Sequence, residues 1–223
     1  YVQPDLVPIK NYVDNCIKAI ADDGFERFGF SGGYITIPEK INGNPDAYLS
    51  ALPQSGFKIP YWWHKGIDSV PPLVFIQNQL SAYIKGQLNS CINNFEPFNS
   101  TFTINKLSEP VVYVQFNEED TTITMDYSLE ILGKGRDFTS SVKNFKFKSN
   151  VRFKKMYELA KTIMERENKD AFLERKTIDM YSIDTEIPTT DLEVSCAAKV
   201  WELIQEEDNF SLNETSLLSQ GIE

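Results

Sequence analysis

The chain has 223 residues, of which 41% are hydrophobic and 24% are charged, and its formal net charge is −10. This length is enough for one large domain or two small ones with a well-filled core. The negative charge argues against nucleic acid and against an anionic membrane surface as partners, because both are bound through clustered Lys and Arg.

A first amphipathic helix is predicted over residues 5–28. Apolar side chains recur there at steps of three and four, which place them on one face of a helix. Gly29 is suited to end the helix in a left-handed conformation, and "YITIP" over 34–38 then predicts a short strand that stops at Pro38. The members of the helical stripe are Ile9, Val13, Cys16, Ile17, Ile20, Ala21, Phe25 and Phe28.

The three glycines in "FGFSGGYITIP", residues 28–38, are typical of phosphate-binding loops, but their setting argues against one. Such loops run from strand to glycines to helix, because the anion sits at the helix N-terminus, where free N–H groups point toward it. Here a helix comes first and a strand follows. We therefore expect a tight reversal of the chain at Gly32 and Gly33, and no cofactor.

Residues 39–71 are predicted to form a long, ordered surface loop packed by its own aromatic side chains. Within it, "PYWWHKG" places Tyr61, Trp62, Trp63 and His64 next to one another. These rings have three interpretations: a hydrophobic plug that seals the loop, a contact for a partner protein, or a platform for a sugar ring. His64 is the only histidine and no nucleophile motif accompanies it, so we expect neither a catalytic triad nor a multi-histidine metal site.

Consecutive strands follow a second helix, which is predicted over 72–95. Alternating apolar residues predict strands over 101–107, 110–116, 121–132 and 138–150. Together these strands make an antiparallel meander of three to four strands with one polar face.

Helices are predicted to close the chain. A third helix over 151–169 continues toward residue 183, and a last one over 191–207 precedes a polar tail. Strands in a row flanked by helices indicate an α+β fold, in which the first two helices pack on the meander. We expect one α+β domain over 1–190 and an acidic C-terminal helix and tail over 191–223, where eight acidic residues accompany one lysine.

Acidic residues offer no clear catalytic pair. Most lie on predicted helix surfaces or in turns such as "NEED" at 117–120, where we expect them to be solvated. Asp126 has apolar neighbours, but strand alternation puts it on the polar face. We therefore nominate no catalytic residue. A hydrolase that uses carboxylates remains a hypothesis, ranked after the two functional hypotheses given at the end of this subsection.

Three cysteines, Cys16, Cys91 and Cys196, are too far apart in the sequence for a CxxC redox or zinc motif. Cys16 and Cys91 each lie in the apolar stripe of a predicted helix. They are therefore either buried free thiols or the two halves of a disulfide between helices.

Three N-x-S/T sequons mark candidate glycosylation sites. All three lie in polar segments that we expect to be turn-like, where a glycan has room. The acceptor residues are Asn99, Asn209 and Asn213.

Three stretches of the chain resemble a group of uncharacterised archaeal cell-envelope proteins. They are "VPIKNYVDNCIKAIADDGFERFGFSGGYITIP" from residue 7, "YWWHKGIDSVPPLVFIQNQLSAYIKGQLNSCINNF" from residue 61 and "VSCAAKVW" from residue 194. Proteins of that group carry a pilin-like hydrophobic helix directly before a segment like residues 6–20, and continue as an extracellular α+β ectodomain. The resemblance covers residues 6–95 well and the rest in outline.

The resemblance implies location and topology, and it brings no catalytic residues. It implies a cell-surface location, an anchor helix upstream of Tyr1, and a disulfide between Cys16 and Cys91, which stand where the group has cysteines. The chain opens without methionine and lacks the anchor, so we expect a processed or truncated product whose end at Glu223 falls short of a full ectodomain.

The leading functional hypothesis is therefore a non-enzymatic, surface-exposed envelope protein, either an anchored ectodomain or a subunit of an extracellular filament. Its expected partners are copies of itself or other envelope proteins, with membrane contact only through a segment before Tyr1. The second hypothesis is a secreted glycan- or protein-binding module that uses Tyr61, Trp62 and Trp63.

Overall fold

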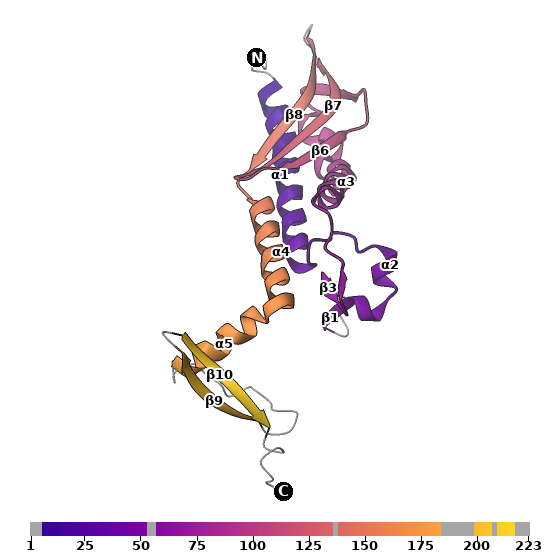
Figure 1. The fold of residues 1–223 in the computed structure, drawn as a ribbon. Coiled ribbons are helices and arrows are strands. Elements are labelled where there is room, and N and C mark those ends of the chain that lie inside the picture. The colour runs from indigo at the N-terminus through magenta and orange to yellow at the C-terminus, as the bar shows by residue number, and fades with distance from the viewer. Residues whose placement is uncertain (1–5, 53–56, 136–137, 184–198, 207–208, 217–223) are drawn as a thin grey trace. The chain divides into compact units, whose positions relative to one another are not determined.

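The computed structural model describes residues 6–52, 57–135, 138–183, 199–206 and 209–216. It shows the α+β fold that the sequence predicts, with helices and antiparallel sheets (Figure 1). The chain forms two compact units, Tyr1–Lys161 and Thr162–Glu223, which are described separately below. No helix within the described residues is long and apolar enough to span a bilayer.

Two long helices, α1 (Val7–Phe30) and α3 (Leu73–Ile92), pack against each other in the first unit. The predicted stripe of α1 is buried except for Phe25, which is half-buried, and α3 buries an apolar residue at every fourth position from Ile76 to Ile92. The helix α1 runs through Gly29, contrary to the expected stop there. It ends before Gly32 and Gly33, which have φ values of +59° and +91° and allow the chain to reverse.

The main sheet is built around one long strand, β7 (Thr121–Gly133). The strands β5 (Phe102–Lys106) and β6 (Val111–Phe116) pair in succession with one edge of β7, and β8 (Thr139–Ser149) pairs with the other edge. All pairings are antiparallel, so β6, β7 and β8 form the predicted meander.

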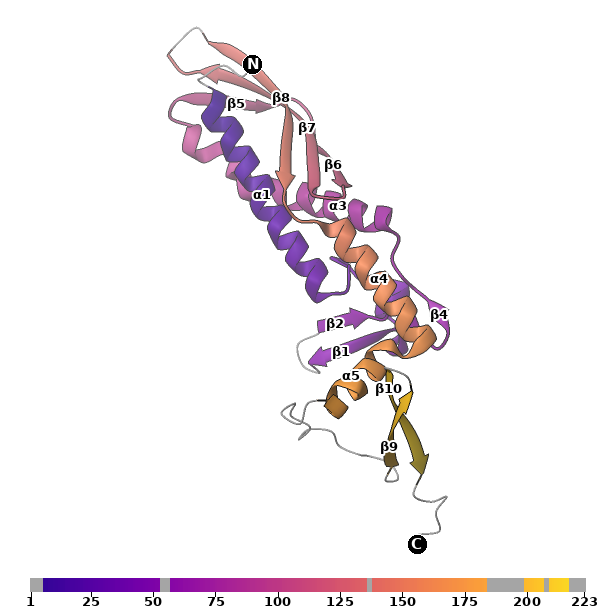
Figure 2. The same cartoon turned by 60° about the vertical axis from the view of Figure 1, so that its left-hand side comes forward.

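The core lies between one face of this sheet and the helices α1 and α3 (Figure 2). Every second residue of β7 from Thr121 to Ile131 is buried, and the residues between them face outward, which is the alternation of a sheet covered on one side. Asp126 is on the outward face, as its position in the strand predicts.

Residues 34–38 do not form the predicted strand. The backbone N–H groups of Ile35 and Thr36 donate to the side-chain oxygen of Gln79 on α3, at 2.7 and 3.0 Å, and the Gln79 amide donates back to the Thr36 carbonyl. The Gln79 side chain satisfies these backbone groups in place of a neighbouring strand, and the segment pairs with no strand of the described residues. Tyr34 is buried in the core.

The segment predicted as a long loop contains short regular elements. These are α2 (Glu39–Asn42), the 3₁₀ turn η2 (Pro45–Ala47) and two small antiparallel ladders, β1 (Tyr48–Leu52) with β2 (Phe57–Pro60) and β3 (Trp63–His64) with β4 (Ile67–Asp68). A further segment, η3 (Asn93–Phe98), follows α3 and is not a regular 3₁₀ helix, because Asn94 and Phe95 have non-helical backbone angles.

The helix α4 (Phe153–Asp170) begins in the first unit, where Phe153 stacks on Phe116 with ring centroids 4.4 Å apart. The predicted continuation toward residue 183 is interrupted at Ala171, which has a φ of +47°, and α5 (Phe172–Ile183) follows.

The second unit ends in an antiparallel pair, β9 (Lys199–Glu206) and β10 (Asn209–Ser216), so the prediction of a helix over 191–207 is wrong for 199–206. Residues 191–198, including Cys196, lie outside the described residues. Val200, Trp201 and Ile204 have side chains that favour a strand, and β9 pairs with β10 along its length.

Candidate functional site

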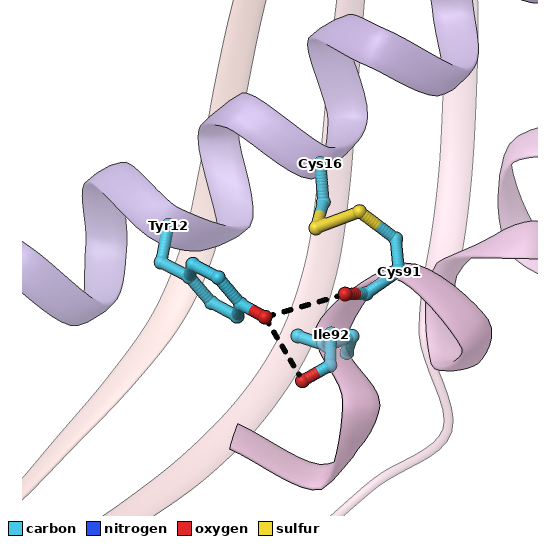
Figure 3. The surroundings of a disulfide bond; sticks show 4 residues. All are labelled: Tyr12, Cys16, Cys91 and Ile92. Carbon is cyan, nitrogen blue, oxygen red and sulfur yellow. Dashed lines mark hydrogen bonds between the residues drawn. A yellow bond between two sulfur atoms is a disulfide. The ribbon is translucent and has the colours of Figure 1, made fainter. Parts of the chain in front are cut away.

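A disulfide joins the two core helices of the first unit. The sulfur atoms of Cys16 on α1 and Cys91 on α3 lie 2.09 Å apart, and their Cα atoms are 5.8 Å apart (Figure 3). One turn before Cys16, the Tyr12 hydroxyl donates to the carbonyl oxygens of Cys91 and Ile92, at 3.3 and 3.4 Å. The end of α3 is therefore held to α1 by both a covalent bond and hydrogen bonds.

The same two helices approach closely at Gly24. A Cβ atom on Gly24 would lie 2.5 Å from Cδ1 of Leu80, which is fully buried, and 3.4 Å from the ring of Tyr83. Gly24 therefore allows the helices to approach closely at this point.

Of the aromatic residues predicted to contact a partner, Trp62 packs inward. Its indole N–H donates to the Gly32 carbonyl at 2.8 Å, and its ring lies 5.6 Å from that of Tyr157 on α4. The Tyr157 hydroxyl in turn donates to the Pro71 carbonyl at 3.0 Å. Trp62 thus packs between α4 and the chain reversal at Gly32 and Gly33, and this packing agrees with the plug interpretation for this one ring.

Tyr61 and Trp63 are more exposed than Trp62. Trp63 and His64 form strand β3 of the β3–β4 hairpin, and Tyr61 lies two residues before this strand. Tyr61 is 37% exposed and Trp63 is 40% exposed, and the Tyr61 ring stacks on His64 with centroids 5.3 Å apart. Trp63 pairs with Asp68 and His64 with Ile67, so Trp63 and His64 face opposite sides of the hairpin. The four residues therefore do not form one continuous platform.

A polar group bridges α1 and α3 beside Gly24. Both Arg27, through Nε at 2.8 Å, and the Tyr83 hydroxyl donate to one oxygen of Asp23, and the Arg27 guanidinium lies over the Tyr83 ring. The hydrogen bond from Arg27 lowers the pKa of Asp23, and burial raises the pKa of Tyr83. The i,i+4 spacing of Asp23 and Arg27 could have predicted this pair, but no pattern pointed to Tyr83.

Two open hollows adjoin this group. One, of about 290 Å³, lies between α1 and α3 and reaches Cys91, and the other, of about 560 Å³, lies between α3 and residues 35–38. Tyr83 and Gln87 line both. Both are open to solvent, and an open shape fits surface contact with a partner better than enclosure of a small substrate.

The acidic turn between β6 and β7 forms ion pairs with basic residues of β8 and α4. Glu118 and Glu119 are exposed, as the sequence predicts, and Asp120 is half-buried. Asp120 forms an ion pair with Lys148 at 2.8 Å, and Glu118 and Glu119 pair with Lys154 and Lys155. The run of six basic residues from Lys143 to Lys155, with no acid among them, is the sequence feature that could have predicted this partner.

The sequons differ in setting. Asn99 is exposed in the turn after η3, which is the predicted setting for a glycan acceptor. Asn209 and Asn213 lie within the strand β10 and not in turn-like segments, because β10 pairs along its length with β9.

No group of three His, Cys, Asp or Glu side chains that could hold a metal ion occurs among the described residues. Comparisons with known proteins identify no relative: no family model, no curated protein and no solved structure matches the chain.

Proposed function

We propose that the chain is a non-catalytic cell-envelope protein exposed outside the reducing cytosol, either the ectodomain of an anchored protein or a subunit of an extracellular filament. The observation that carries this proposal is the disulfide between Cys16 and Cys91. Disulfides persist in oxidising environments and are rare in the cytosol, where thiols are kept reduced. The exposed sequon at Asn99 supports the same location.

Peptide mapping of native protein without reduction tests the location. We expect a cross-linked pair of peptides that contain Cys16 and Cys91, and labelling of the exposed Lys143 by a membrane-impermeant amine reagent on intact cells. A free thiol at Cys16 in native material, together with absence of surface labelling, would contradict the proposal.

The size of the native assembly separates the two forms of the proposal. Sedimentation and electron microscopy of material released gently from cells should show polymers for a filament subunit. A monomer would exclude the filament and leave the anchored ectodomain.

A second candidate function, a glycan- or protein-binding module, is favoured by the exposure of Tyr61 and Trp63 at the β3–β4 hairpin. Exposed aromatic rings bind sugars by stacking and are enriched at the centres of protein interfaces. Trp63→Ala should abolish binding to a panel of envelope polysaccharides while the unfolding midpoint stays unchanged. Trp62→Ala is the matched control, because it should lower the midpoint through lost packing against Tyr157.

A further inference from the structure

The chain turns left-handed directly after α3. Asn93, Asn94 and Phe95 have φ values of +40°, +50° and +58°, and ψ values between +28° and +52°. L-residues disfavour this region, which Asn tolerates better than most and a bulky residue such as Phe adopts rarely. Three such residues in a row need support from the surrounding structure.

Apolar contacts with α1 provide part of that support. The Phe95 side chain is 1% exposed and belongs to the core. The Tyr12 ring lies 6.4 Å from the Phe95 ring and meets the Phe98 ring edge-on at 5.4 Å. Phe95, within the left-handed turn, and Phe98, after it, therefore both pack against the Tyr12 side chain of α1.

Polar contacts hold the two asparagines. The Asn93 amide donates to Glu96 at 2.6 Å, and the Lys106 ammonium donates to the side-chain oxygens of Asn94 and Asn89, at 3.2 and 3.3 Å. These groups are exposed, so water competes with them, and they contribute less than the buried contacts.

The disulfide is the remaining constraint, and it lies next to the turn. Cys91 is two residues before Asn93, and its partner Cys16 is one helical turn after Tyr12, on the same face of α1 (Figure 3). We propose that the Cys16–Cys91 disulfide is a redox-sensitive latch that keeps residues 93–95 in the left-handed turn, so that reduction releases this turn while the sheet remains folded.

The chemistry of release is thiol–disulfide exchange with a dithiol. One thiolate of the dithiol attacks a protein sulfur and forms a mixed disulfide, and its second thiol displaces the protein thiol. The dithiol is oxidised to a disulfide, and the protein gains two electrons and two protons as two thiols. Cys16 is 4% exposed, but Cys91 lines the 290 Å³ hollow, so Cys91 is the sulfur that a reductant reaches. This inference does not depend on the proposed envelope function.

Hydrogen exchange measured by mass spectrometry on the full chain tests the latch. The measured quantity is the exchange rate of peptides covering 92–98 divided by the rate of peptides covering 123–131 of β7. We expect the ratio to rise by about tenfold or more when folded protein is reduced with dithiothreitol. A destabilisation of the whole chain would raise both exchange rates and therefore cancels in their ratio. An unchanged ratio would overturn the proposal.

A matched pair of variants tests whether the left-handed backbone is what the disulfide holds. Asn94→Gly and Asn94→Ala both lose the contact with Lys106, but Gly accepts a positive φ and Ala does not. In the reduced form, the ratio should be several-fold higher for the Ala variant than for the Gly variant. Equal ratios would overturn the assignment of the turn as the latched element.

Discussion

At the scale of single residues, two glycines on neighbouring helices have opposite roles. Gly24 on α1 faces Leu80 at a distance that leaves no room for a methyl group, whereas a Cβ on Gly86 of α3 would meet no atom within 4 Å. Gly24→Ala should lower the free energy of unfolding by about 1 kcal/mol, because fully buried Leu80 must move. Gly86→Ala should raise it by up to about 1 kcal/mol through helix propensity.

Urea unfolding of the two variants checks these signs, since each serves as the control for the other. Equal effects of the two substitutions would show that helix propensity, and not the contact between α1 and α3, decides the role of Gly24.

Two tyrosines form a second contrasting pair. The Tyr127 hydroxyl is buried in the core and has no hydrogen-bond partner among the described residues, whereas the Tyr12 hydroxyl donates to two carbonyls. Tyr127→Phe should therefore stabilise the protein, and Tyr12→Phe should destabilise it, each by about 1 kcal/mol. Thermal unfolding measures both, and destabilisation by Tyr127→Phe would mean that its hydroxyl is satisfied in solution.

Stability at alkaline pH gives an additional check on the burial of the Tyr127 hydroxyl. Burial raises its pKa to about 12, above the ordinary value of 10.0. The unfolded chain therefore loses this proton first, and stability should fall as the pH rises from about 10 toward 12. The Tyr127→Phe variant should show a smaller fall over the same range.

At the scale of elements, the turn between β6 and β7 depends on ion pairs. The hydrogen bond from Lys155 lowers the pKa of Glu119 below 4.5, and that from Lys148 lowers the pKa of Asp120 below 3.8. A carboxyl group whose pKa is lower in the folded than in the unfolded chain stabilises the protein at pH values above its unfolded pKa. This stabilisation is lost as the pH falls through the folded pKa. Asp120→Asn should therefore lose less stability than the wild type on acidification below about pH 4.

Urea midpoints at pH 7 and in acid measure this difference. Asp126→Asn is the matched control, since Asp126 is exposed on the same sheet and forms no ion pair with any described residue. If Asp120→Asn and Asp126→Asn show equal acid sensitivity, the ion pair with Lys148 has no role in the pH dependence.

Elements in which apolar residues recur with a clear period could be predicted from the sequence. Alternation predicted the strands of the main sheet. The pattern failed where nonlocal partners decide the structure. Residues 34–38 bond to Gln79 in place of a strand, and residues 199–206 pair with β10.

Parts of the candidate site show the same limit. The sequence left Cys16 and Cys91 as either free thiols or a disulfide, because helical periodicity says nothing about which helices touch. It grouped Tyr61, Trp62 and Trp63 together, because adjacency in sequence does not reveal that Trp62 bonds to the Gly32 carbonyl. The left-handed turn at 93–95 carries no glycine that could have marked it.

At the scale of the whole molecule, the disulfide closes a sequence separation of 75 residues. Loop-closure entropy predicts that such a link stabilises the folded chain by about 4 kcal/mol, by restricting the unfolded state. The double variant Cys16→Ser with Cys91→Ser should show this loss in urea unfolding at pH 7. A loss near zero would mean that the unfolded chain already holds the two segments together.

The packing of α1 also has a consequence for the nascent chain during synthesis. This helix is synthesised before its partners, because it packs on α3 and on β8, which ends at Ser149, 119 residues after α1 ends at Phe30. At roughly 5–20 residues per second, the apolar face of α1 waits on the order of ten seconds for its last partner. During that interval the nascent chain presents an unpaired amphipathic helix, which is the kind of segment that chaperones bind.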